Sequence, residues 1–261
     1  MTPVIALAGN PNVGKSTVFN ALTGLHQHTG NWSGKTVGTA EGYFRRGKKE
    51  VRLVDLPGAY SLTANSAEEE VTRDFLCFEH PDAAVVVCDA CCLERNLIFA
   101  IQVAQIIPKT MLCVNMMDEA RHRGIKIDLA ALSAETGLPA VGVSATRYEG
   151  LDELERQMIS LAEGRLHSVF VPVRYPKAVE SAAESLTQVL RKRYGITSIF
   201  PVLKLLENEH GFVAAFEKRF GKISANRELT GAIGKANRIM KDGGVTKKNI
   251  SDKLAACAVL R

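Results

Sequence analysis

A lysine and a hydroxyl group follow a glycine-containing loop near the start of the chain. Residues 9–17 read GNPNVGKST and fit the pattern G-x-x-x-x-G-K-[ST]. In this pattern backbone N–H groups surround phosphate oxygens, the lysine neutralises them, and the hydroxyl is a ligand for Mg²⁺. We therefore expect Lys15 and Ser16 to bind a magnesium nucleotide. Further nucleotide contacts are expected from Asn10, Pro11, Asn12, Val13, Gly14 and Thr17.

Three more short motifs bear on the metal and on the base. Asp55, in DLPG at residues 55–58, can hold Mg²⁺ through a water, while the Gly58 N–H meets a γ-phosphate. Asp118, in NMMD at residues 115–118, can accept two N–H donors of guanine, a donor pair that adenine lacks. The Ala145 N–H, in SAT at residues 144–146, can donate to the guanine carbonyl. We also expect base contacts from Asn115, Met116, Ser144 and Thr146. Each motif alone is common, but their order at successive strand ends predicts guanine.

Two segments are expected to respond to the γ-phosphate. Thr36 lies in a polar stretch with several glycines, and its hydroxyl could complete the Mg²⁺ shell only while the γ-phosphate is present. This predicts that residues 25–36 form a loop ordered by GTP and released by hydrolysis, with residues 56–65 as the partner switch. Without the other motifs, Thr36 would read as an ordinary threonine at the start of a strand.

These residues need a scaffold that brings strand ends together. From residue 3 to about 163, strand and helix patterns alternate, which predicts an α/β fold with a mostly parallel sheet wrapped by helices. The expected strands are 4–8, 37–45, 51–54, 83–88, 110–115 and 140–143, and the expected helices are 15–23, 67–78, 93–106, 129–136 and 151–161. The turn Arg46-Gly47-Lys48-Lys49 predicts an antiparallel hairpin at the sheet edge. Ser66 and Glu69 predict a capping box.

The pattern of apolar residues changes after Pro172 and Pro176, where they recur at helical spacing. We expect domains at residues 1–165 and 166–261, the second all-helical. Its glycines are expected to divide it into four or five short helices, at Gly195, Gly211, Gly221, Gly231, Gly234 and Gly243-Gly244. Residues 1–170 carry a net charge of −4 and residues 171–261 one of +9. The basic part is either a solvated surface or a face toward an anionic partner, a membrane or RNA.

The amino-acid composition limits the class of protein to which this chain can belong. Hydrophobic residues make up 46% of the chain, and no run approaches the roughly 18 apolar residues of a membrane span. We expect residues 1–261 to be soluble and cytoplasmic, with reduced cysteines. The Cys88-x-x-Cys91 spacing could indicate redox or zinc chemistry, but it lacks a second pair, so structural thiols are the favoured interpretation. His26 and His28 could bind a metal, although two ligands in a moving loop make a poor site.

Four motifs make the chain resemble the cytoplasmic GTPase region of the ferrous iron transport protein B (FeoB) family. They are GNPNVGKST at 9–17, HTGNWSGKTV at 28–37, DLPGAYSL at 55–62 and LERNL at 93–97. The resemblance implies a slow GTPase, a second helical domain, and a natural protein that continues into a polytopic iron-transporting domain. The chain would then lie at the cytoplasmic face of the bacterial inner membrane, and its basic part near the inner leaflet. It could also form a homo-oligomer.

The resemblance also implies a monovalent cation. GTPases with asparagine at the position of Asn12 often use K⁺, which here would be held by Asn12 and by carbonyls near Gly30 and Trp32. Asn12 could instead cap a turn. We therefore expect the catalytic residues to be Lys15, Asn12, Thr36 and Gly58. Departures from the family are Ser33 and Lys35 in the first switch, where proline and often valine are usual, and Met116, which replaces the lysine that packs on the base.

Two other functions remain open at this level. Many bacterial GTPases that bind RNA or ribosomes combine the same phosphate loop with a basic C-terminal domain. This chain, however, shows no aromatic-studded sheet, GXXG loop in context or zinc knuckle, so we do not expect nucleic acid as a partner. The other alternative is a nucleotide-dependent binding module in which turnover plays no part.

Overall fold

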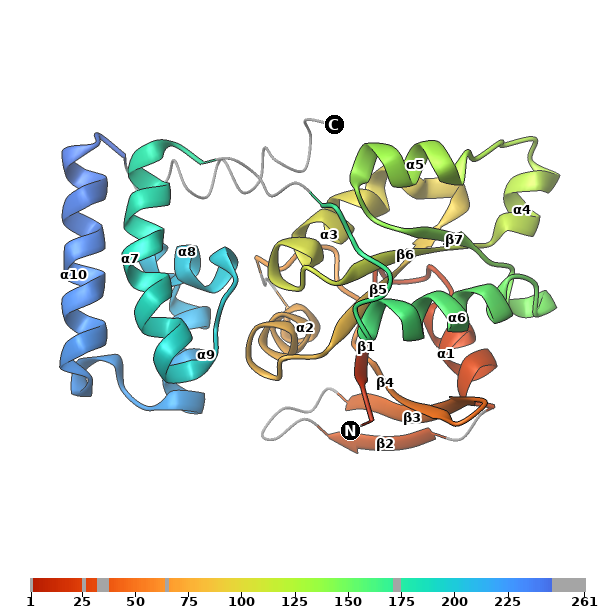
Figure 1. The fold of residues 1–261 in the computed structure, drawn as a ribbon, viewed down its shortest axis with the longest axis horizontal. Coiled ribbons are helices and arrows are strands. Elements are labelled where there is room, and N and C mark those ends of the chain that lie inside the picture. Colours follow the sequence, from red (N-terminus) through yellow and green to blue (C-terminus); the bar gives the residue numbers. More distant parts are fainter. Residues whose placement is uncertain (1, 25–26, 32–37, 64–65, 171–174, 246–261) are drawn as a thin grey trace. The chain divides into compact units, whose positions relative to one another are not determined.

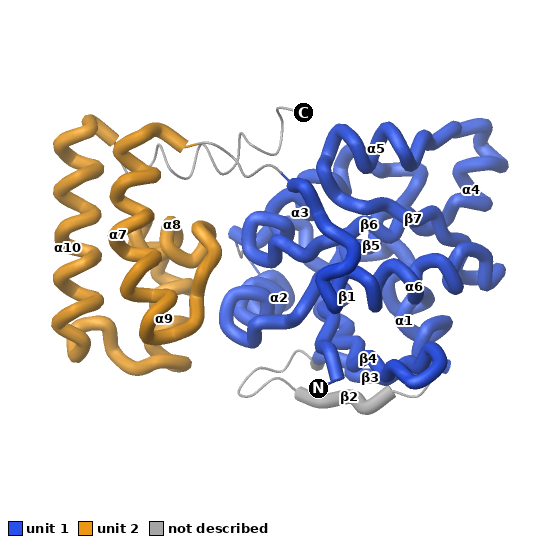
Figure 2. Tube along the Cα trace, viewed as in Figure 1, with its two compact units in different colours: residues 1–171 blue, residues 172–261 orange. Residues whose placement is uncertain are grey.

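The computed structural model describes residues 2–24, 27–31, 38–63, 66–170 and 175–245 (Figure 1). Contacts within the chain divide it into two compact units, residues 1–171 and 172–261 (Figure 2). The first contains the sheet and the second contains only helices among its described residues. No helix in these ranges combines the length and the apolar character needed to cross a membrane.

The first unit is built on a seven-stranded sheet in the order β2-β3-β4-β1-β5-β6-β7. The five strands from β4 to β7 in this order run parallel, whereas β2, β3 and β4 pair antiparallel. The strands are β1 (Val4–Gly9), β2 (Gln27–Asn31), β3 (Gly38–Arg46), β4 (Lys49–Asp55), β5 (Ala83–Asp89), β6 (Thr110–Asn115) and β7 (Ala140–Gly142). Because parallel neighbours end at one edge, the residues that follow β1, β4, β6 and β7 are brought together there.

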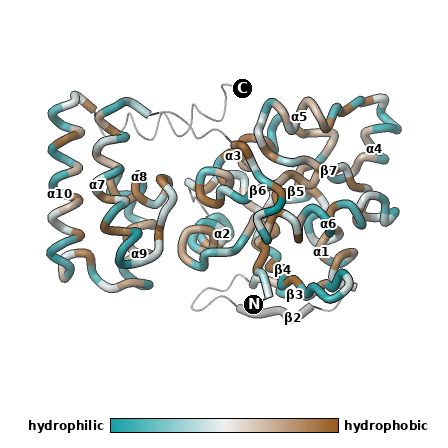
Figure 3. The backbone as a smooth tube through the Cα atoms, viewed as in Figure 1, coloured by the Kyte–Doolittle hydropathy of each residue, from teal (hydrophilic) through white to brown (hydrophobic). Residues whose placement is uncertain are grey.

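Helices cover both faces of this sheet (Figure 1). On one face α1 and α6 pack with the strands, where Phe19 and Leu154 join Leu7, Val85 and Met111 in one buried cluster. On the other face α3 packs against β1, β5 and β6. The helices of this unit are α1 (Lys15–Thr23), α2 (Ala67–Phe78), α3 (Leu93–Ile106), α4 (Met117–His122), α5 (Leu129–Thr136) and α6 (Leu151–Ala162), with 3₁₀ turns η1 (Ala90–Cys92) and η2 (Ala145–Arg147). Figure 3 shows the central strands as hydrophobic, as expected for strands buried on both sides.

The predicted fold class is confirmed, and four helices begin and end at the expected residues. The cap of α2 also forms, since the Ser66 side chain accepts a hydrogen bond from the Glu69 N–H at 3.2 Å. The hairpin of β3 and β4 is antiparallel as expected, with Gly47 at φ 62° in its two-residue turn. Its predicted place at the sheet edge is wrong, because β2 pairs along the outer side of β3.

Strand β2 replaces part of the loop expected at residues 25–36. Its sequence QHTGN has no alternation of apolar residues, and it becomes a strand by pairing with β3 from Gln27↔Gly42 to Asn31↔Gly38. Residues 25–26 and 32–37 of that stretch lie outside the described residues. Pairing with a neighbouring strand thus overrides a local sequence typical of a loop.

The second unit consists of α7 (Lys177–Tyr194), α8 (Ile199–Glu207), α9 (His210–Phe220), the 3₁₀ turn η3 (Ile223–Ala225) and α10 (Arg227–Asp242). Helices α7 and α10 pack along each other and bury Leu186, Leu190, Leu229, Ala236 and Met240.

Three of the glycines expected to divide this unit do not end a helix. Gly231 and Gly234 lie within α10, and Gly211 lies in the first turn of α9. A glycine inside a helix costs about 1 kcal/mol relative to alanine, which the packing of α10 on α7 outweighs.

Candidate functional site

The loop between β1 and α1 has the backbone of a phosphate cradle. Gly14 caps α1 at φ 76° without a side-chain hydrogen bond, so the N–H groups of the first turn stay available to a ligand. A Cβ atom at Gly14 would collide with the amide nitrogen of Asn115 and lie 3.3 Å from Cε of Met116. Glycine is therefore required here both by the positive φ and by the close approach of β6.

Lys15 and Ser16 both reach the end of β4. The Lys15 ammonium forms an ion pair with one carboxylate oxygen of Asp55, and the Ser16 hydroxyl lies 3.5 Å from the other. Lys15 and Asp55 are 9% and 11% exposed. Burial raises the pKa of the Asp55 carboxyl, and the neighbouring Lys15 opposes that rise. A hydroxyl and a carboxylate side by side are hard oxygen ligands, which fit Mg²⁺.

The DLPG segment lies against the phosphate loop. The Ala59 N–H donates to the Gly9 carbonyl at 3.1 Å, and the Leu56 N–H donates to the Leu7 carbonyl at 3.0 Å. A Cβ atom at Gly58 would lie 3.1 Å from the backbone of Pro11. The backbone of Gly58 therefore lies beside the loop that would hold phosphates, where the sequence predicts it.

Asn115 joins three segments at the end of β6. Its amide nitrogen donates to the Val13 carbonyl at 3.1 Å, and its amide oxygen accepts from the Ala145 N–H at 3.1 Å. Asn115 is 3% exposed, so both halves of the amide are paired in the interior. The Ala145 N–H, predicted to donate to a guanine carbonyl, donates to Asn115 in this structure, and its role toward the base stays a prediction.

Asp118 begins the short helix α4 beside the loop after β7. Its N–H donates to the Ser144 hydroxyl at 3.1 Å, and its carboxylate Oδ2 lies 2.9 Å from Nε of Arg147. Partial burial works to raise the pKa of the Asp118 carboxyl. The N–H groups of Glu119 and Asp118 and the charge of Arg147 outweigh it, so the pKa lies below its ordinary value. The carboxylate is therefore ionised at neutral pH and acts only as an acceptor.

The structure describes only some of the residues predicted to bind K⁺ or the γ-phosphate. Asn12 lies in the loop at φ 65°, a conformation that asparagine tolerates better than most residues. Gly30 lies in β2, paired with Thr39. Thr36 and Trp32 lie outside the described residues, as does His26. Of the residues predicted to hold K⁺, the structure therefore describes Asn12 and the backbone of Gly30.

The second predicted switch is held by side chains that sequence reasoning missed. Oε1 of Glu69 accepts from the Tyr60 and Ser61 N–H groups, each at 3.2 Å, and Oε1 of Gln102 accepts from the Leu62 N–H at 2.9 Å. The Arg95 guanidinium lies 4.7 Å from the centre of the Tyr60 ring. Arg95 belongs to the LERNL motif and Tyr60 to DLPGAYSL. The presence of both motifs in one chain was the feature of the sequence that could have indicated this contact.

Two further features of the first unit concern Asn10, one of the expected nucleotide contacts, and the buried cysteines. The Asn10 side-chain oxygen is buried and has no hydrogen-bond partner among the described residues. Burial raises the pKa of the Cys88 thiol to about 12, and it also raises the pKa of the Cys113 thiol. Both thiols are therefore protonated at neutral pH, in line with structural cysteines. The described residues contain no group of three or more side chains suited to hold a transition metal.

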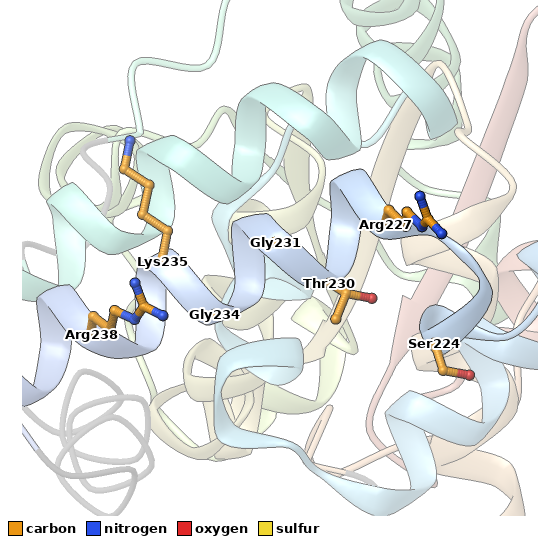
Figure 4. A pocket seen from close by; sticks show the side chains of 7 residues that line it. All are labelled: Ser224, Arg227, Thr230, Gly231, Gly234, Lys235 and Arg238. Atoms are coloured by element: carbon orange, nitrogen blue, oxygen red, sulfur yellow. The ribbon is translucent and has the colours of Figure 1, made fainter.

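The second unit carries a hollow of about 510 Å³ along the outer side of α10 (Figure 4). It contains none of the predicted site residues. Gly231 and Gly234 leave it open, and the basic residues Arg227, Lys235 and Arg238 line it, none of them in an ion pair with any described residue.

A sequence model of the family described as "Ferrous iron transport protein B" matches residues 3–158. A fusion protein of Fe(2+) transport protein A and Fe(2+) transporter FeoB from Porphyromonas gingivalis is 39% identical over 212 residues, which cover 78% of this chain and 25% of that protein. The Fe(2+) transporter FeoB of Escherichia coli K12 is 36% identical over 190 residues, covering 71% of this chain and 24% of the transporter. The chain thus spans about a quarter of the length of these relatives.

Solved structures agree over nearly the whole chain. A GDP-bound mutant of the S. thermophilus FeoB G-domain superposes with a TM-score of 0.76 at 28% identity, covering 99% of this chain and 96% of that one. The cytosolic domain of the T. maritima FeoB iron transporter in its apo form has a TM-score of 0.71 at 30% identity and covers 98% of both chains.

Replacement of Asn115 should destabilise the fold itself. In Asn115→Ala, the Val13 carbonyl and the Ala145 N–H lose their partner in the interior, so the free energy of unfolding should fall by roughly 2–4 kcal/mol. Urea denaturation measures this change. Thr146→Ala, an exposed change in the same loop, should stay within about 0.5 kcal/mol of the unmodified chain. Equal stability of the two variants would contradict the role given to the Asn115 amide.

Proposed function

The chain belongs to the ferrous iron transport protein B family, and from that premise we propose that it is a guanine-nucleotide switch that hydrolyses GTP slowly. The observation that carries the proposal is the double hydrogen bond of Asn115. It ties the phosphate loop at Val13 to the 144–146 loop, beside the Asp118 carboxylate. A phosphate cradle and a guanine acceptor are thereby held at fixed separation, as one nucleotide requires.

In this proposal the residues at the start of α1 neutralise the negative charge of the nucleotide's phosphates. Lys15 meets the β- and γ-phosphates, and the α1 N-terminus adds further positive character. Ser16 and Asp55 would hold Mg²⁺, with Thr36 as a third ligand, and the ion supplies charge neutralisation at the phosphates. The relatives crystallised with GDP support guanine at this site.

Slow hydrolysis follows from the side chains beside Gly58. The next residue is Ala59, which is 1% exposed and has no group that could orient water or accept a proton. Catalysis then depends on positioning by the Gly58 N–H and on cationic charge. Asn12, together with the backbone near Gly30 and Trp32, would hold K⁺, which supplies charge that other GTPases obtain from an arginine.

We place this switch in ferrous iron transport across the bacterial inner membrane. The relatives are named as Fe(2+) transporters and are about four times longer than the matched region, which supports a membrane domain as the partner in the same polypeptide. Residues 1–165 would form the GTP-binding domain and residues 166–261 a helical domain leading to the transporter, both at the cytoplasmic face.

The basic hollow of α10 suggests where the helical domain meets the membrane. Arg227, Lys235 and Arg238 lie on one exposed helix face and form no internal ion pair with the described residues, so their charge is available to anionic headgroups.

The base assignment predicts a change of nucleotide in Asp118→Asn. The asparagine amide cannot accept both donors of guanine, but its NH₂ can donate to the 2-carbonyl of xanthine. GTP affinity should fall by roughly 100-fold or more, since two hydrogen bonds to a charged group are lost, and xanthosine triphosphate should bind better than GTP. Calorimetry with GTP, xanthosine triphosphate and ATP measures both effects. Asp128→Asn, with the same change of charge at an exposed helix cap, is the control. ATP bound as tightly as GTP by the unmodified chain would refute the proposal.

The cation assignment predicts that Asn12→Ala and Asn12→Gly lose any advantage of K⁺ over Na⁺. Phosphate release in the two salts measures it, and the rate ratio of each variant should be about one, with nucleotide affinity within about threefold of the unmodified chain. Asn12→Gly separates loss of the amide from backbone strain, because glycine adopts the positive φ freely. Equal rates of the unmodified chain in both salts would remove K⁺ from the proposal.

The membrane assignment predicts that the chain binds vesicles containing phosphatidylglycerol but not vesicles of phosphatidylcholine alone. Replacing Arg227, Lys235 and Arg238 together by glutamine should weaken binding on the order of 100-fold, at about 1 kcal/mol per basic residue. Co-sedimentation measures the bound fraction. The control replaces the exposed α7 residues Lys177, Arg191 and Lys192 by glutamine, with the same change of net charge. Equal weakening by both triple variants, or binding to RNA in place of vesicles, would contradict this assignment.

A further inference from the structure

Arg147 forms an ion pair with the carboxylate predicted to recognise guanine. Its Nε lies 2.9 Å from Oδ2 of Asp118. Arg147 follows the SAT motif directly, and none of the predicted roles includes it. Other cations nearby are occupied elsewhere, because Arg123 pairs with Glu119 at 2.7 Å and Arg121 pairs with Glu149. Among the described residues Arg147 is therefore the cation that faces Asp118.

The backbone holds Arg147 in this place. Residues 144–149 form a closed loop, in which Ser144 and Glu149 exchange N–H···O bonds at 3.0 and 3.3 Å. The Arg147 N–H donates to the Ser144 carbonyl at 2.9 Å within the 3₁₀ turn. Gly150 closes the loop at φ 79°, so tight against the Gly142 carbonyl that a Cβ atom would collide with it. The Cα of Arg147 is thus held by a short loop closed by backbone hydrogen bonds.

The Arg147 side chain is far less restrained than its backbone. It is 63% exposed, whereas Asp118 is 18% exposed. An ion pair with one exposed partner is weak and is screened by salt. Exposed side chains also change rotamer within picoseconds to nanoseconds. The pair is therefore an equilibrium between a bound and a free carboxylate, and it adjusts faster than any nucleotide associates.

Guanine and Arg147 need the same acceptor. The N1–H and the 2-amino group of guanine together use both oxygens of a carboxylate, and Arg147 occupies one of them. We propose that Arg147 competes with the guanine base for Asp118 and thereby slows association of the nucleotide. This inference rests on the base-binding role proposed for Asp118. The observed rate of association is the rate for a free carboxylate multiplied by the fraction of chains in which the carboxylate is free, while the dissociation rate is unchanged.

The experiment compares Arg147→Gln with Arg123→Gln. Arg123 is 59% exposed and pairs with Glu119, the next acidic residue of α4, so its replacement removes the same charge without removing the partner of Asp118. Stopped-flow mixing with a fluorescent GDP analogue gives association and dissociation rates separately. Arg147→Gln should associate about two to five times faster than the unmodified chain, as expected for an exposed ion pair. Its dissociation rate should not change, and Arg123→Gln should alter neither rate.

A second pair of variants tests whether the effect passes through Asp118. In the Asp118→Asn background with xanthosine diphosphate, the charge-assisted bond to Arg147 is absent, so adding Arg147→Gln should change association less than twofold. Thermal melting of each variant checks that the fold is kept.

Three outcomes would overturn the inference. They are an unchanged association rate in Arg147→Gln, a gain that appears in the dissociation rate instead, or an equal gain in Arg123→Gln. Failure of the unmodified chain to bind the GDP analogue at all would refute the proposed function, and is thereby distinguished from failure of the competition.

Discussion

The interaction on which the site depends is the buried amide of Asn115. A buried amide without hydrogen-bond partners destabilises the fold by more than a paired amide stabilises it. Because Asn115 is buried, both halves of its amide need a partner. One reaches the Val13 carbonyl and the other the Ala145 N–H. One side chain thus ties the loops after β1 and β7 to β6, and its close approach is one of the two reasons, with the positive φ, why residue 14 is glycine.

The two ends of the site differ in how strongly their charges are held. At the phosphate end Lys15 and Asp55 are about nine-tenths buried, and removing either charge would leave the other unpaired in a poorly solvated place. At the base end Arg147 is mostly exposed, and water readily replaces its contact with Asp118. The nucleotide of the proposed function would rearrange both pairs. The Lys15–Asp55 pair can be replaced only by a ligand with comparable charge. The Arg147–Asp118 pair can be replaced at little cost in free energy.

Much of this site could be predicted from sequence because its parts are local. The GNPNVGKST loop, the strand ends and most helix bounds follow from short motifs and from the spacing of apolar residues. The features that were missed depend on contacts between distant segments. Strand β2 exists through its pairing with β3, and α10 runs through Gly231 and Gly234 because α7 packs beside it. The pairing of Arg147 with Asp118 joins residues 29 positions apart in the chain, and neither residue type alone indicates it.

The segment after Asp55 is suited to convert a change at the phosphate end into a change at α2 and α3. Its backbone is bound on one side to Gly9, through the Ala59 N–H, and on the other to Glu69 and Gln102. Because Tyr60, Ser61 and Leu62 are consecutive, their hydrogen bonds cannot be broken one at a time without straining the neighbours. Each bond is worth about 1 kcal/mol, so the three together hold this segment to α2 and α3. A displacement of Gly58 would therefore be passed to α2 and α3, while β1 and β5, which are buried, would stay in place.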